Sequence, residues 1–169
     1  MAQYTPAQLA ELRELSASML ATIRQAIREN TSDPRPFLDQ MRQLATGYGM
    51  GGFAYAVRAW LDTVIDTFPQ IQRGEIHGIA FTNETRDGFV SAQEMPFEYR
   101  WAATALSARM RDDQVALYKL IGQVPPDRAG VYALRVLDLV AGALEDLDRG
   151  DRTGPLRTGD VLVVQPVDV

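Results

Sequence analysis

Residues 125–150, PPDRAGVYALRVLDLVAGALEDLDRG, carry the clearest helical pattern in this chain. Pro125 can end one helix and Pro126 can begin the next, and behind them apolar residues return every three or four positions. Arg149 and Gly150 then supply a favourable charge and a glycine cap at the end of the helix. The stretch therefore predicts a long helix that buries one face in a helical core. That face would consist of Ala129, Ala133, Val136, Leu137, Val140, Leu144 and Leu147.

The same spacing recurs toward the amino terminus. Thr5 followed by Pro6 is typical of a helix start, because Thr can accept from an unpaired N–H and Pro suits the first helical position. Gly47 to Gly52 indicate a flexible connection, and Pro69 ends the helix that follows it. We expect about six helices, at residues 6–29, 36–45, 53–68, 97–111, 115–121 and 126–149.

Two segments lack the helical period and favour strands. Asp87-Gly88 between β-prone residues predicts a hairpin near residues 76–92. Residues 160–165 form an apolar, β-branched run that needs a pairing partner, and it contains Val161, Leu162, Val163 and Val164. This strand would either join the hairpin in a small sheet or augment a neighbouring molecule.

The predicted fold is mainly α. It is a single-domain helical bundle over residues 1–150 with a minor β element, followed by a carboxyl-terminal tail with a strand at 151–169.

Composition narrows the class of protein. The 169 residues include 46% apolar and 23% charged side chains, which is typical of a folded globular chain. The net charge is −5, Lys119 is the only lysine, and no basic cluster is present, so nucleic-acid binding is not expected. The sequence has no cysteine, no apolar run of the ~18 residues that a membrane helix needs, and no recognisable secretion signal. We therefore expect a cytoplasmic protein without a membrane contact.

Gly47, Gly49 and Gly52 formally match a phosphate-binding glycine pattern ahead of a helix. A dinucleotide fold would need a preceding strand, and here the preceding segment is helical. We interpret the glycines as a helix end that runs into a turn, with a weak anion-binding site as the alternative.

Apolar side chains surround these glycines. Tyr48, Met50, Phe53 and Tyr55 would form an adaptable cluster on a mobile connection, which is typical of a protein-binding surface. Together with the apolar run at 161–164, they are the candidate protein-binding residues.

Asp62 and Asp66 lie four residues apart, as in a carboxylate-metal phosphohydrolase. Arg58 precedes Asp62 by four residues, so a surface ion pair explains the pattern equally well. His77 is the only histidine and has no nucleophile beside it, so we identify no catalytic residue, no metal site and no cofactor.

The helix pair at 113–148 resembles helix-turn-helix geometry. Its only basic residues near the start of the second helix are Arg128 and Arg135, and nearby acidic residues would repel phosphate. An antiparallel helix pair within the core accounts for the same pattern.

The sequence thus favours a non-enzymatic interaction, adaptor or assembly protein. We expect it to act through protein–protein contacts, including contacts between its own copies and contacts made by the carboxyl-terminal strand. A DNA-binding regulator using 113–148 and a phosphohydrolase using Asp62 and Asp66 are the alternatives.

Overall fold

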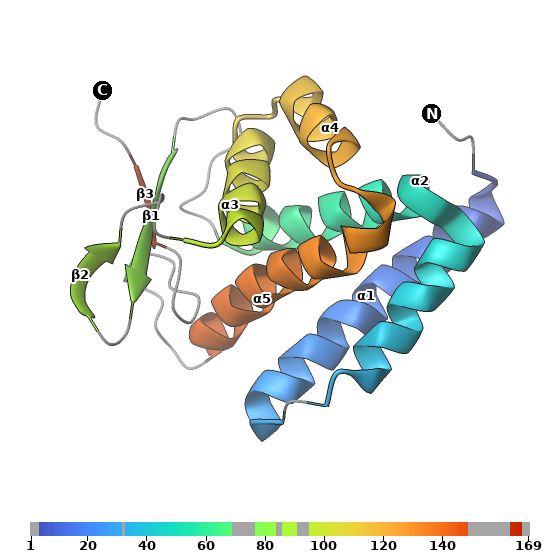
Figure 1. Cartoon of the computed structure of the whole chain (residues 1–169), viewed down its shortest axis with the longest axis horizontal. Coiled ribbons are helices and arrows are strands. Elements are labelled where there is room, and N and C mark those ends of the chain that lie inside the picture. Colours follow the sequence, from blue (N-terminus) through green and yellow to red (C-terminus); the bar gives the residue numbers. More distant parts are fainter. Residues whose placement is uncertain are drawn as a thin grey trace.

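Helix α5 (Ala129–Asp148) lies at the centre of the computed structural model, where α1, α2 and α3 all contact it (Figure 1). Six of the seven residues predicted for its buried face are buried, and Leu147 is partly buried against the core. Tyr132, Leu139, Ala141 and Ala143 are buried as well, so helices cover α5 on several sides. The pattern in residues 125–150 therefore predicted the central helix correctly.

The structure describes residues 4–31, 33–68, 77–83, 86–90, 95–148 and 163–166. In the strands the structure describes the backbone alone. Within these limits the chain forms a single helical domain of five α-helices. The other four are α1 (Pro6–Glu29), α2 (Arg35–Thr67), α3 (Phe97–Met110) and α4 (Gln114–Gly122), and a 3₁₀ turn at Pro126–Arg128 precedes α5.

Local capping fixes the start of α1. The backbone N–H of Gln8 donates to Thr5 Oγ1 at 3.2 Å, and the N–H of Thr5 donates to Gln8 Oε1 at 2.9 Å. These two bonds form a capping box, with Pro6 at the first helical position. Asn30 ends the helix with φ 49°, in the left-handed conformation that asparagine tolerates.

The predicted connection at residues 47–52 is a single sharp break within α2. The chain stays helical through the glycine-rich segment, with one sharp break at Gly49, where φ is 56° and ψ is −150°. Glycine can adopt this conformation in a single residue, so the helix changes direction without a flexible connection. The predicted helices at 36–45 and 53–68 therefore extend up to this break from either side and are counted together as α2, so the described residues hold five α-helices.

Three short strands lie beside the helices: β1 (His77–Asn83), β2 (Arg86–Val90) and β3 (Val163–Pro166). They pair antiparallel in the order β2-β1-β3. Asp87 and Gly88, the predicted turn residues, lie inside β2, where Phe89 next to them pairs with Thr82 of β1. In β3, the backbone of Val163 pairs with that of Ala80, and Val164 with Ile79. Val161 and Leu162, like most of the predicted tail at 151–169, lie outside the described residues.

None of the helices in the described part of the chain combines the length and the apolar character that a bilayer span requires.

Candidate functional site

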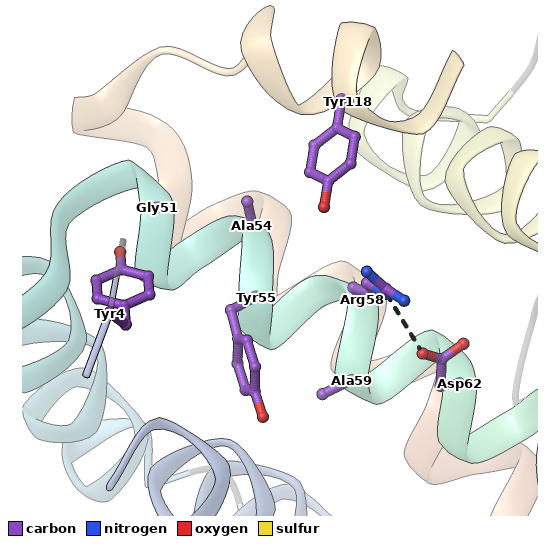
Figure 2. A pocket seen from close by; sticks show the side chains of 8 residues that line it. All are labelled: Tyr4, Gly51, Ala54, Tyr55, Arg58, Ala59, Asp62 and Tyr118. Atoms are coloured by element: carbon purple, nitrogen blue, oxygen red, sulfur yellow. Dashed lines mark ion pairs between the residues drawn. The ribbon is translucent and has the colours of Figure 1, made fainter. Parts of the chain in front are cut away.

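A groove of about 560 Å³ runs along the exposed face of the second half of α2 (Figure 2). The lining residues from α2 follow one another at helical spacing, so they share one face of the helix. The opposite face of the same segment is buried in the core. The groove is lined by Gly51, Ala54, Tyr55, Arg58, Ala59 and Asp62 from α2, together with Tyr4 and Tyr118.

Small residues in α2 make the floor of the groove, and tyrosines from two other segments flank it. Gly51, Ala54 and Ala59 leave space above the helix backbone. Tyr4 lies just before α1, and Tyr118 points from α4 toward α2 (Figure 2). The Tyr118 side is open to solvent, because Tyr118 is 39% exposed.

A chain of hydrogen bonds holds Tyr4 in place at one side of the groove. Its hydroxyl donates to the carbonyl oxygen of Tyr48 at 3.1 Å, and the two rings meet edge to face with centroids 5.9 Å apart. The Tyr48 hydroxyl in turn donates to the Glu11 carboxylate, and this hydrogen bond, with some burial, raises the pKa of Tyr48 above its ordinary value. Through these two hydrogen bonds, Tyr48 connects the first turns of α1 to the break in α2.

A buried arginine joins the floor of the groove to α3. Arg109 is 5% exposed, and its Nε donates to Asp62 Oδ1 at 2.7 Å. Its Nη1 donates to Asp112 Oδ1 at 2.8 Å, in the turn before α4. Asp113 caps α4 by accepting from the N–H of Ala116 at 2.9 Å. These bonds set the position of α4, and with it that of Tyr118.

Arg58 is the positive charge that lines the groove. Its Nε lies 3.7 Å from Asp62 Oδ2, so the predicted ion pair is present but too long for a hydrogen bond. Asp62 already accepts from Arg109 at 2.7 Å. The side chain of Arg58 is 42% exposed, so its guanidinium can reach a bound molecule without leaving Asp62 uncompensated.

The four residues predicted to form a cluster around the glycines have different surroundings in the structure. Phe53 is 2% exposed and stacks on Trp101, with ring centroids 6.4 Å apart, so it belongs to the core. Tyr48 and Met50 are partly buried against the core. Tyr55 alone of the four lines the groove. Tyr48 lies before the break at Gly49 and the other three residues lie after it, where the helical period directs them to different faces.

The glycines that suggested an anion site are also part of α2. Gly47 and Gly52 are helical, so the interruption ahead of the following helix is confined to Gly49. Gly52 serves packing instead, since a Cβ there would lie 2.3 Å from the Cβ of Tyr48.

Asp62, one of the two residues proposed for a metal site, pairs with Arg58 and Arg109, and two further acidic residues, Glu145 and Asp148 of α5, also pair with arginines. Arg24 and Arg28 donate to Glu145 at 2.6 and 2.7 Å, and both also donate to Asp148. Among the residues that the structure describes, no group of three or more acidic or histidine side chains is placed to hold a metal ion. Asp62 contacts Arg109, as described above.

The helix pair at 113–148 corresponds to α4 and α5. Arg128 pairs with Glu98, and Arg135 bonds Asp138 and the Tyr99 hydroxyl, each at 2.9 Å. Both arginines that could have contacted bases are thus held by neighbouring side chains.

Sequence reasoning missed most of the groove. It identified Tyr55 and the Arg58–Asp62 pair, but Tyr4 and Tyr118 come from segments remote from α2 in the sequence. The small residues Gly51, Ala54 and Ala59 were the available signal, because their helical spacing places them on one face of the helix.

No protein-family model, no curated protein and no solved structure matches this chain.

Proposed function

We propose that this chain is a helical interaction protein that acts through protein–protein contacts, with the α2 groove as its binding surface. The observation that supports this most is the composition of the groove: three tyrosines and one arginine around a floor of small residues. Tyrosine and arginine are enriched at the energetic centres of protein interfaces, where their large side chains pack against a partner.

The position of α5 weakens the DNA-binding alternative. A recognition helix must enter the major groove of DNA with an exposed face. Helix α5 is covered by α1, α2 and α3, and its two candidate arginines are paired. The phosphohydrolase alternative loses support because Asp62 is held by Arg109 and Arg58.

Self-association through the carboxyl-terminal strand is a second proposal. In the structure, β3 pairs with β1 of the same chain, which favours a strand that folds back within one molecule. Light scattering on the full chain and on a truncation after Arg157 tests the point. A monomer in both forms would remove self-assembly from the proposal.

The groove itself can be tested by selection from a displayed library of 14-residue peptides on the full chain. The matched variants are Ala54→Trp, which fills the groove, and Ala45→Trp, which lies on an exposed part of the same helix. We expect peptides that bind the unmodified chain and Ala45→Trp but not Ala54→Trp. If every selected peptide binds all three proteins alike, or none is enriched, the groove is not a protein-binding surface.

A further inference from the structure

We infer that the α2 groove accepts an amphipathic helix of about three turns that places a carboxylate on Arg58. This inference rests on the proposed protein-binding function and specifies the chemistry of the partner.

The shape of the floor favours a helix. Its residues run from Gly51 to Asp62, which at 1.5 Å per residue is about 16 Å, or three turns. The hollow above Gly51, Ala54 and Ala59 allows close approach of another helix, and the tyrosines on either side would contact its apolar residues. Recognition of an amphipathic helix by an apolar groove follows this pattern.

Backbone hydrogen bonding also favours a helical partner over an extended one. The floor is an α-helix whose N–H and C=O groups bond within the helix, so it offers no free edge to an extended peptide. An extended segment would leave its backbone groups on the groove side without protein partners. A helix satisfies its own backbone and presents only side chains.

The positive charge of Arg58 determines which charged residue the partner should carry. Of the charged residues that line the groove, Asp62 accepts a hydrogen bond from Arg109, whereas Arg58 stands 3.7 Å from Asp62. A guanidinium forms its strongest contacts with a carboxylate, through two parallel hydrogen bonds. An acidic residue in the partner therefore complements Arg58, whereas a basic one would meet a like charge.

The spacing within the partner follows from α2. Arg58 lies one turn beyond Ala54, where the small floor residue leaves room for a bulky apolar side chain. We expect the acidic residue of the partner three or four positions from a Leu, Ile, Phe or Met that fills this space.

Peptides selected on the full chain and blocked by Ala54→Trp provide the probe. We expect them to carry Asp or Glu at that spacing. Fluorescence anisotropy of one labelled peptide should show Arg58→Gln weakening binding roughly fivefold to tenfold, as expected for one charged contact. Replacing the peptide's acid by Gln should cost a similar factor, and combining both changes should cost little more than either alone.

Arg42→Gln is the matched control, because Arg42 is an exposed arginine in α2 outside the groove. It should leave the affinity unchanged, and thermal melts should show that Arg58→Gln folds like the unmodified chain. A charge swap adds a gain of function: Arg58→Glu should bind the peptide whose acid is replaced by Lys better than it binds the original.

The outcomes separate this inference from the proposed function. Peptides that Ala54→Trp blocks, but that lack an acid preference and ignore Arg58→Gln, would overturn the carboxylate contact and leave the groove as a protein-binding surface. A dimer of the full chain that Ala54→Trp dissociates would assign the groove to a second copy and overturn a separate helical partner. The absence of any peptide blocked by Ala54→Trp would overturn both.

Discussion

At the scale of the residue, Gly49 determines the direction of α2. Its φ of 56° and ψ of −150° lie in a region that is essentially restricted to glycine. Gly47, two residues earlier, is helical, and a Cβ there would meet nothing within 4 Å. Position 49 therefore requires glycine, whereas position 47 can accept a residue with a side chain.

Replacing each by alanine tests this difference. Gly49→Ala should lower the free energy of unfolding by about 1–3 kcal/mol, because alanine is strained in that conformation. Gly47→Ala should raise it by about 0.5–1 kcal/mol, because alanine is the better helix former. Urea denaturation followed by circular dichroism measures both, and two variants of equal stability would show that α2 does not depend on the break at Gly49.

Arg109 is a second residue on which the packing depends. Its guanidinium is buried and compensates Asp62 in α2 and Asp112 beyond α3. Arg109→Met keeps the length of the side chain but removes the hydrogen bonds to both carboxylates, which remain 24% and 57% exposed to water. We expect the free energy of unfolding to fall by about 1.5–3 kcal/mol, the usual contribution of hydrogen bonds to charged groups.

The matched change is Arg42→Met, since Arg42 and Asp39 form an exposed ion pair that contributes little. We expect this variant to unfold within about 0.5 kcal/mol of the original in the same denaturation experiment. Equal losses for the two arginines would mean that Arg109 does not hold α3 against the groove.

At the scale of the element, an ion-pair network joins the ends of α1 and α5. Burial raises the pKa of Glu145, but the hydrogen bonds and charges of Arg28 and Arg24 outweigh this and hold its pKa below the ordinary value of 4.5. The folded state therefore binds this proton less readily than the unfolded state. The resulting stabilisation is complete above pH 4.5 and is lost as the pH falls through the lower pKa of the folded form.

Glu145→Gln removes this contribution. Urea unfolding should give a variant less stable than the original at neutral pH, by an amount that stays constant down to about pH 5 and shrinks in stronger acid. A difference that is the same at pH 3 as at pH 7 would show that Glu145 is not ionised in the fold.

The elements also show what the sequence could predict. Capping by Thr5 and the apolar period of α5 are local signals, and both led to correct helices. The glycines at 47–52 indicated a break between two helices, but the sequence pattern does not reveal that the break is confined to the backbone angles of Gly49. The ion pair of Arg24 with Glu145 spans 121 residues, so only the folded arrangement of α1 and α5 reveals it.

At the scale of the whole molecule, the groove exists because three separate parts of the chain meet. The start of the chain supplies Tyr4, α2 supplies the floor, and α4 supplies Tyr118. From the sequence, the Arg58–Asp62 pair could be predicted because it lies within one helix. The contribution of Tyr4 and Tyr118 could not be predicted, because their positions depend on the packing of α1 and α4.

Nuclear magnetic resonance of the isotope-labelled full chain tests the binding surface most directly. A selected peptide should shift the amide signals of the floor residues between Gly51 and Asp62, together with that of Tyr118, and the Ala54→Trp variant should abolish these shifts at the same peptide concentration. Shifts confined to other parts of the molecule, with the groove signals unmoved, would contradict the assignment of α2 as the surface that contacts partners.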